Sequence, residues 1–387
     1  MFDKIIYGSR KYYAWVIFLL LVMGVGFVLY LYQLQVGLGV TGMSRDVSWG
    51  FYIAQFTFLV GVAASGLMVV LPYYLHDYKA FGKITILGEF LAVGSVIMCM
   101  TFIFVDMGKP ERVMNVILHP TPNSIMFWDM LVLSVYLLLN LVIAFPIMAA
   151  EKKGLPPPYW YLKPVIYLSI AWAPLIHTVT AFLYAGLPGR HLWLTAIMAA
   201  RFLASAFAAG PALLIILYLI MTRVTNWTAG DKPLRKIAEI VVYAMIANMF
   251  FLALEFFTAF YSNIPGHEHS LAYLFFGLHG ETNWLMPFMW ASVIIGLGSI
   301  ILMLFPQVRR NNALLVLGCI GIFVACWIDK GLGLIVGGFI PNPLNYVRGY
   351  TPTLVELGIS AAVFALGALI ITVLYKMVAG VREEAEA

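Results

Sequence analysis

Residues 13–37 read YAWVIFLLLVMGVGFVLYLYQLQVG and contain no charged side chain. A helix needs about 20 consecutive apolar residues to cross the hydrocarbon core of a bilayer, so this run is long enough to span one. Nine similar runs follow it. The predicted spans are 13–37, 49–75, 84–106, 126–149, 164–187, 193–222, 236–262, 283–305, 313–339 and 354–375. The sequence therefore predicts an all-α integral membrane protein with ten transmembrane helices.

The composition of the 387 residues agrees with this prediction. Hydrophobic residues make up 63% of the chain and charged residues only 11%, and the mean hydropathy is +0.93. These values exclude a soluble globular domain and leave the lipid bilayer as the solvent. The net charge of +5 comes from basic residues in the loops. Because such residues orient helices, we expect no nucleic-acid partner.

The basic residues also predict the orientation of the chain. Sixteen of the 23 Lys and Arg residues fall in loops or tails on one side of the ten spans, five fall on the other side, and Arg201 and Lys330 lie within apolar runs. Loops rich in Lys and Arg stay in the cytoplasm. We therefore expect a multi-pass protein of the cytoplasmic (inner) membrane with both termini in the cytoplasm.

The loops suggest how the spans are grouped. The longest connections, 107–125 and 263–282, lie on the predicted outer side, and three prolines at 156–158 mark a seam between the fourth and fifth spans. Small residues at 64–66 in the second span recur at 208–210 in the sixth, which indicates either a parallel repeat or close helix packing. The predicted units are 1–48 (first helix and outer loop), 49–192 (first four-helix bundle), 193–345 (second four-helix bundle) and 346–387 (last helix and cytoplasmic tail).

Ionisable residues within membrane spans are costly and are therefore candidates for function. Most of them fall in the outer half of the membrane, whereas Glu89 lies in the inner third. The candidates for proton transfer are Glu89, His177, Arg201, Glu255 and Glu356. Structural alternatives are open: Arg201 and Glu255 could form an ion pair between the sixth and seventh spans, and His177 could bond either of them. Asp329 and Lys330 are expected to compensate each other.

Metal and haem ligands are sparse. Cys99, Cys319 and Cys326 are isolated in apolar runs, which indicates packing and predicts no iron–sulfur cluster in this chain. Only His177 lies deep in a span, so a transmembrane haem with two histidine ligands lacks its second ligand, and a single haem with Met or other ligation is the remaining alternative. The other histidines, in loops or at helix ends, are His76, His119, His191, His267, His269 and His279.

The densest polar and aromatic cluster begins on the predicted outer side at the end of the third span. It contains Asp106, Arg112, His119, Ser124, Trp128 and Asp129, and Trp49, Tyr52 and Gln55 open the second span on the same side. Such donors and acceptors suit a quinone carbonyl or a partner surface. Turn chemistry and an interfacial aromatic belt explain the same residues without a function.

At these residues the chain resembles the NrfD/polysulfide-reductase family of membrane subunits, most closely its ten-helix branch. That branch includes the DsrP subunit of a membrane complex associated with sulfite reduction and the HybB hydrogenase subunit. The resemblance spans nearly the whole chain. It rests on Trp49-Gly50, Gly61 and Gly66, Asp106-x-Gly108-x-Pro110-x-Arg112, Ser124 with Trp128-Asp129, His177 with Pro188-Gly189, Arg201 to Phe207 with Gly210-Pro211, and Tyr350 to Thr353 with Glu356.

The resemblance implies two four-helix bundles plus two flanking helices, a menaquinone or other quinone site near the outer face, and no haem or iron–sulfur cluster in this chain. It also implies a ferredoxin-like iron–sulfur subunit on the outer side, with further membrane and cytochrome subunits. As a working hypothesis, quinol or quinone binds among the outer ends of the second to fourth spans. Asp106, Asp129 and His119 would exchange protons with it. The lining would come from Trp49, Tyr52, Gln55, Arg112, Ser124 and Trp128.

Two other classes of protein fit the same pattern. Ten helices with buried charges and a repeat also occur in secondary transporters. A passive membrane anchor for an oxidoreductase is the second alternative. A transporter would work alone, whereas a redox subunit would purify with an iron–sulfur partner.

Overall fold

The computed structural model describes residues 7–225, 227–278 and 283–386. In this part of the chain ten helical spans are long and apolar enough to cross a membrane, which confirms the predicted all-α membrane fold. The uninterrupted spans are α2 (Arg10–Val36), α5 (Thr85–Asp106), α7 (Ile125–Lys152), α8 (Tyr159–Ala185), α9 (Met198–Val224), α10 (Asp231–Ser262), α12 (Leu285–Leu304) and α16 (Leu354–Glu386).

Two spans change their helical type within the membrane. The second span consists of α3 (Phe51–Ala63), the 3₁₀ turn η2 (Ala64–Gly66) and α4 (Leu67–Leu75). The ninth consists of α14 (Asn312–Cys326), the π-helical segment η6 (Trp327–Gly333) and α15 (Leu334–Phe339). Changes of this kind inside a helix often mark functional or strained positions. The shorter elements are η1 (Leu38–Val40), η3 (Lys79–Phe81), η4 (Pro110–Arg112), α6 (Asn115–Leu118), η5 (His191–Trp193), α11 (Pro265–Phe275) and α13 (Pro306–Arg310).

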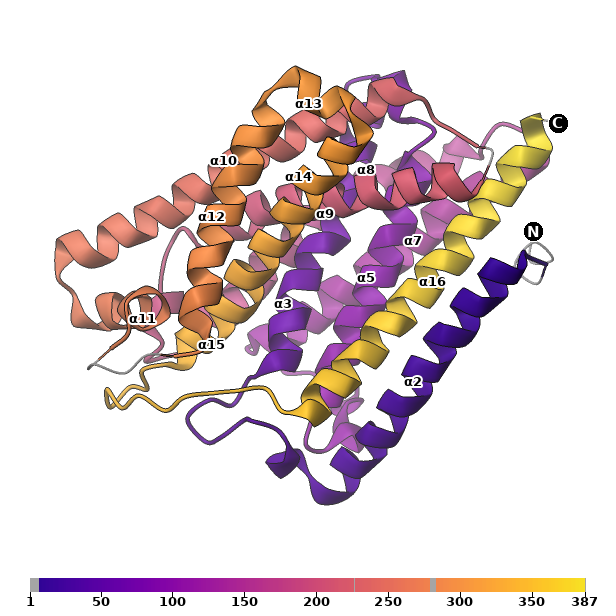
Figure 1. Cartoon of the computed structure of the whole chain (residues 1–387). Coiled ribbons are helices and arrows are strands. Elements are labelled where there is room, and N and C mark those ends of the chain that lie inside the picture. The colour runs from indigo at the N-terminus through magenta and orange to yellow at the C-terminus, as the bar shows by residue number, and fades with distance from the viewer. Residues whose placement is uncertain (1–6, 226, 279–282, 387) are drawn as a thin grey trace.

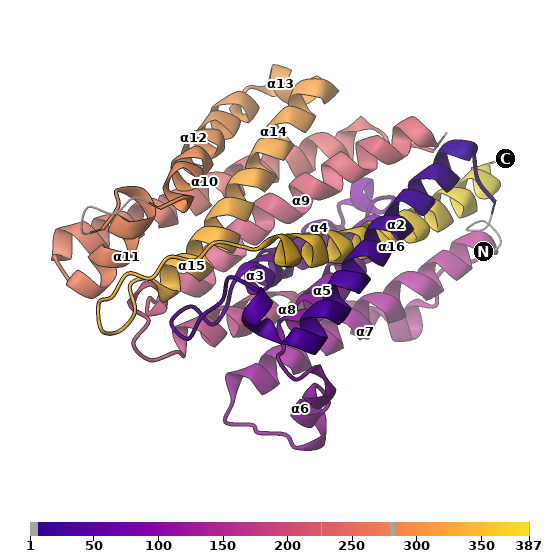
Figure 2. The same ribbon diagram turned by 60° about the horizontal axis from the view of Figure 1, so that its bottom comes forward.

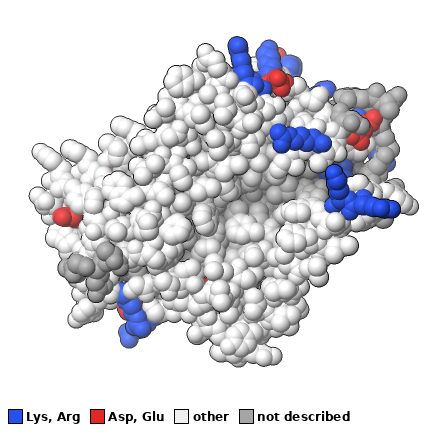
Figure 3. Space-filling view, in the orientation of Figure 1, with Lys and Arg blue, Asp and Glu red and all other residues white. Residues whose placement is uncertain are grey.

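The two ends of the molecule differ. The start of α2 and the end of α16 lie side by side at one end, here called the proximal end (Figure 1). Residues 37–50 and 340–353, together with η4, α6 and α11, lie at the opposite, distal end (Figures 1 and 2). On the face in Figure 3 a broad flank carries almost no charge, and most of the visible Lys and Arg side chains gather toward the proximal end. This distribution is the one expected for a protein immersed in lipid.

The spans α3 to α8 are here called the first group and α9 to α15 the second group, and contacts occur within and between them. In the first, α3 contacts α5 and α8, and α7 contacts α5 and α8. In the second, α9 contacts α10 and α14, and α12 contacts α10 and α14. Helix α16 packs on α2 and α5, and α9 touches α3 and α8 to join the groups. The division of the chain at residues 48, 192 and 345 stays a prediction.

Small residues let the helix backbones approach closely. A Cβ atom added at Gly88 in α5 would lie 3.0 Å from the Gly66 Cα and 2.9 Å from a Val69 methyl group. One added at Gly210 in α9 would lie 3.0 Å from the Ser65 Cβ. The small residues at 64–66 and 208–210 therefore pack against neighbouring helices, as one interpretation of the sequence predicted. The repeat itself stays a prediction.

We expect Gly88→Val to destabilise the protein by about 1–3 kcal/mol, because overpacking forces the α5 and η2 backbones apart. The matched control is Gly298→Val in α12, where an added Cβ meets nothing within 4 Å. Cys99, Cys319 and Cys326 are buried, so thermal unfolding can be followed with a thiol-reactive fluorophore. Equal melting temperatures for the two variants would contradict close packing at Gly88.

Candidate functional site

The most deeply buried ion pairs join helices of the second group. Arg201 in α9 contacts Glu255 in α10 through one guanidinium nitrogen. Through the other it contacts Asp329 in η6, with 2.6 Å between Nη2 and Oδ1. The predicted pair between Arg201 and Glu255 is confirmed. The predicted compensation of Asp329 by Lys330 is wrong, since neighbouring residues on a helix do not face each other and Asp329 is held by Arg201.

Lys330 points away from Asp329. Its Nζ lies 4.1 Å from the centroid of the Phe202 ring and 3.5 Å from the Phe202 carbonyl oxygen. A Cβ atom added at Gly61 in α3 would lie 3.0 Å from this Nζ, so the missing side chain leaves room for the ammonium group. Among the described residues, no carboxylate lies within 4 Å of it. Lys330 is therefore a buried cation between the two groups of helices, held by a ring and a carbonyl.

His177 in α8 is fully buried, and neither ring nitrogen has a hydrogen-bond partner among the described residues. The alternative in which His177 bonds Arg201 or Glu255 is therefore wrong, because neither residue lies within hydrogen-bond reach of the imidazole. A buried imidazole without partners is costly unless a ligand or a water completes its hydrogen bonds. His177 stays a candidate for proton transfer.

Glu356 anchors the start of α16. Its carboxylate accepts hydrogen bonds from the backbone of Thr353 at 2.9 Å and of Gly42 at 2.7 Å, and from the Tyr350 hydroxyl at 2.6 Å. The Glu356 backbone N–H in turn donates to Thr353 Oγ1, which completes a capping box. Burial raises the pKa of Tyr350, so its hydroxyl keeps the proton that it donates. Glu356 thus has a structural role, and its role in proton transfer stays a prediction.

Asp106, by contrast, is incompletely bonded. It ends α5 at the distal end, and its Oδ1 is buried without a hydrogen-bond partner among the described residues. Gln33 of α2 lies nearby: its amide donates to the Val105 carbonyl at 2.7 Å and accepts from the Tyr52 hydroxyl at 2.7 Å. Sequence reasoning predicted Tyr52 and Asp106 but missed Gln33. Gln33 is a neutral polar residue inside an apolar run, and this pattern in the sequence could have identified it.

Asp129 and a group of packed aromatic rings both lie toward the distal end. Asp129 in α7 accepts a 2.6 Å hydrogen bond from Thr180 in α8. Trp49 packs against the rings of Tyr184, Trp193 and Phe339, with centroids 5.7 to 6.1 Å apart. This packing joins the distal ends of the two helical groups and explains why Trp49 is partly buried.

Gln55 of α3 links the second span to the ninth. Its Oε1 accepts a 2.6 Å hydrogen bond from the indole of Trp327 at the start of η6. Its Nε2 is buried without a partner among the described residues. The Gln55 amide therefore offers one unused donor within the protein interior.

The remaining predicted lining residues lie at the surface. Arg112, His119 and Trp128 are exposed, and the Trp128 indole donates to the Pro122 carbonyl at 2.8 Å. Ser124 is half-buried at the start of α7 and makes no side-chain cap there. The predicted site residues thus differ in burial: Tyr52, Gln55 and Asp129 are buried and Asp106 is half-buried, whereas Arg112, His119 and Trp128 are exposed.

Glu89 borders a small cavity in the first group of helices. The cavity measures about 10 Å³, and both Glu89 carboxylate oxygens are buried without a partner among the described residues. Its lining is Gly66, Leu67, Val70, Glu89, Tyr136, Asn140, Ser169 and Ile170. That volume is near the minimum of roughly 10–15 Å³ needed for one water. Sequence reasoning missed Tyr136 and Asn140, although their spacing places both on one face of α7.

No group of three or more His, Cys, Asp or Glu residues that could hold a metal ion occurs in the described ranges. The three cysteines are buried and free. Of the peripheral histidines, five lie at helix ends or in the short distal helices, and His279 lies outside the described residues.

The family model "Polysulphide reductase, NrfD" matches residues 39–339. This chain belongs to the NrfD polysulphide reductase family. The matched region contains eight of the ten spans and every buried charge described above except Glu356. The family resemblance seen in the sequence is thereby confirmed, and the choice of the DsrP branch stays a prediction.

Three relatives align over almost the whole NrfD-family chain. A putative membrane subunit of dimethyl sulfoxide reductase from Halobacterium salinarum is 27% identical over 92% of this chain and 88% of its own length. The "Hdr-like menaquinol oxidoreductase integral membrane subunit" of Archaeoglobus fulgidus is 26% identical over 90% of this chain and 85% of its own length. The "Menaquinone reductase, integral membrane subunit" of Nitratidesulfovibrio vulgaris is 21% identical over 97% of this chain and 93% of its own length.

We expect Arg201→Gln to lower the stability of this NrfD-family protein by about 3–5 kcal/mol, because it leaves Glu255 and Asp329 as buried carboxylates without a counter-charge. Lys330→Met is the matched comparison. It removes a cation that contacts a ring, at a cost of roughly 0.5–2 kcal/mol. Thermal unfolding of both variants in one detergent tests this order. A larger loss for Lys330→Met would refute the assignment of Arg201 as the central counter-charge.

Proposed function

We propose that this chain is the quinone-interacting membrane subunit of a respiratory electron-transfer complex. It exchanges electrons between menaquinol or menaquinone and an iron–sulfur subunit at its distal end. Family membership supports this proposal, as do the two relatives whose names state menaquinol oxidation or menaquinone reduction. The observation that carries it is the buried, unsatisfied carboxylate oxygen of Asp106 beside the Gln33 and Tyr52 network.

The chemistry of quinol requires such groups. Oxidation of a quinol to a quinone releases two electrons and two protons, and the protons need acceptors within hydrogen-bond reach. Asp106 and Asp129 are distal carboxylates suited to accept them, and His119 on the outer loop can pass protons to solvent. The unused Gln55 amide donor fits a quinone carbonyl. A quinone is apolar enough to reach these residues from the lipid.

Partner subunits are supported by the relatives, whose names describe them as membrane or integral membrane subunits of oxidoreductases. We propose a ferredoxin-like iron–sulfur subunit, whose clusters carry single electrons, docked on the distal loops. The segment with α6 protrudes there (Figure 2) and exposes Met114, Ile117 and Leu118. An exposed apolar patch of this kind suits a protein interface. Further membrane and cytochrome subunits complete the proposed complex.

The finer features of the proposal rest on sequence. The protein resides in the cytoplasmic membrane with its proximal end inside, because the basic loops lie at that end. A link to sulfite or sulfate reduction rests on the resemblance to the DsrP branch. Proton movement across the membrane is a further part of the proposal. Glu89, on the proximal side with its water-sized cavity, and the unpartnered His177 support it.

We expect Asp106→Asn and Asp129→Asn to lower quinol oxidation by the purified complex about a hundredfold or more, because each removes a proton acceptor. Asp77→Asn, at an exposed position after α4 and away from the distal loops, is the matched control and should leave turnover unchanged. The measurement is steady-state oxidation of a soluble quinol analogue.

Unchanged turnover in both Asn variants would remove these residues from the site. Failure of the chain to purify with any cluster-bearing partner, combined with solute uptake by the chain alone, would instead favour a secondary transporter. Absence of quinone-analogue binding in an otherwise intact complex would favour a passive anchor.

If protons cross the membrane, proteoliposomes containing the complex should change their internal pH during quinol oxidation. Glu89→Gln should reduce that change to the level of empty vesicles while the protein stays folded, since the amide cannot carry a proton. A pH-sensitive dye trapped inside the vesicles measures the effect. Turnover without any pH change in the unmodified complex would reject proton translocation.

A further inference from the structure

A basic cavity lies at the proximal ends of α10, α12 and α14, away from the proposed quinone site. It measures about 240 Å³. Its lining includes five Lys or Arg residues but only one acid: Tyr78, Lys232, Arg235, Lys236, Glu239, Pro306, Arg309 and Arg310. This excess of positive charge favours an anionic ligand.

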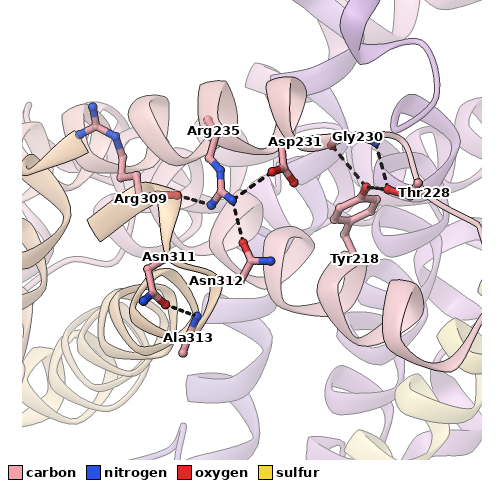
Figure 4. A network of polar contacts seen from close by, with 9 residues as sticks. All are labelled: Tyr218, Thr228, Gly230, Asp231, Arg235, Arg309, Asn311, Asn312 and Ala313. Carbon is pink, nitrogen blue, oxygen red and sulfur yellow. Dashed lines mark hydrogen bonds and ion pairs between the residues drawn. The ribbon is translucent and has the colours of Figure 1, made fainter. Parts of the chain in front are cut away.

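Part of this charge builds the walls of the cavity. The Arg235 guanidinium donates to the Arg309 carbonyl and, at 2.8 Å, to Asn312 Oδ1, and it lies 3.5 Å from Asp231 (Figure 4). Arg309 in turn donates to the carbonyls of Met303 at 2.7 Å and Leu304 at 3.0 Å, near the end of α12. These contacts fix the three helix ends relative to one another.

Two cations are left for a ligand. Lys232 and Arg310 are exposed, and among the described residues neither has an acidic partner. Lys236 pairs with Glu239 at 3.0 Å, so the single acid of the lining is already compensated. The cavity therefore presents an ammonium and a guanidinium group, which together suit the oxygens of a phosphate.

The cavity lies at the level of lipid headgroups. Helix α10 has 32 residues and is about 48 Å long, well beyond a hydrocarbon core of about 30 Å. Its first turns, which carry Lys232 and Lys236, therefore extend past the hydrocarbon. Further along the same face, Tyr243 and Phe250 are about 60% exposed, and Phe305 is exposed at the end of α12. The charged cavity thus continues into a strip of apolar side chains.

We propose that this cavity binds the phosphate of an anionic phospholipid, whose acyl chains lie along the strip formed by Tyr243, Phe250 and Phe305. Basic pockets at the cytoplasmic ends of transmembrane helices commonly hold such headgroups. Lys152 and Lys153 at the end of α7 are exposed basic residues outside this cavity. Free phosphate shares the headgroup chemistry, but it would gain nothing from the apolar strip.

The test compares lipid binding to the purified full-length chain by native mass spectrometry. The probes are phosphatidylglycerol, phosphatidylcholine with the same acyl chains, and inorganic phosphate. We expect Lys232→Gln with Arg310→Gln to weaken phosphatidylglycerol binding about 30-fold, equivalent to about 2 kcal/mol for two basic residues. Lys152→Gln with Lys153→Gln is the matched control with the same change in charge, and it should bind like the unmodified chain.

A second variant separates a lipid from free phosphate. Tyr243→Ser should weaken phosphatidylglycerol binding and leave the weak binding of inorganic phosphate unchanged. The proposal is overturned if phosphatidylcholine binds as tightly as phosphatidylglycerol, if both double variants lose binding equally, or if inorganic phosphate binds as tightly as the lipid. The result is independent of quinol oxidation, so it stands or falls separately from the proposed function.

Discussion

A charged side chain among transmembrane helices costs several kcal/mol unless an opposite charge lies beside it. In this protein Arg201 meets two carboxylates at once, one from α10 and one from η6. This contact ties three spans together where apolar packing alone gives little direction, because lipid is as apolar as the helices it surrounds. It also fixes η6, and η6 in turn directs Lys330 toward Phe202 and Gly61. Through η6, the Arg201 guanidinium therefore supports one of several contacts between the two groups of helices.

The sequence predicted the spans well, because length and hydropathy alone decide whether a helix can cross a bilayer. It could not predict η6, since an apolar run looks the same whether its backbone bonds follow an α or a π pattern. The pairing of Asp329 with Lys330 was wrong because the two residues are adjacent in sequence, and adjacent residues on a helix do not face each other. The start of α10 at Asp231, five residues before the predicted span, reflects helical hydrogen bonding that continues beyond the hydrocarbon.

The sequence predicted which residues belong to the candidate site, but not which of them lack hydrogen-bond partners. Glu356 and Asp106 look alike in sequence, as acids at the distal ends of spans. In the structure Glu356 accepts three hydrogen bonds and caps a helix, whereas Asp106 retains a buried oxygen without a partner. Only the hydrogen-bond inventory separates a structural acid from one that is available to a ligand. Neutral partners such as Gln33 and Asn140 escape a search that considers charged residues alone.

The unsatisfied groups are unevenly distributed among the described residues. Six of the ten residues that carry them lie on α3, η2, α5 and α8, in the first group of helices, and Gln55, Glu89, Asp106 and His177 are among these six. In the second group the arginine and the η6 carboxylate satisfy each other, and Asn248 with one Glu255 oxygen are the exceptions. Buried polar atoms without partners are costly, so a membrane protein keeps them where a ligand or a proton completes the bonds. Among the described residues, the buried ion pairs around Arg201 thus belong to the second group, and buried polar atoms without a partner are more frequent in the first.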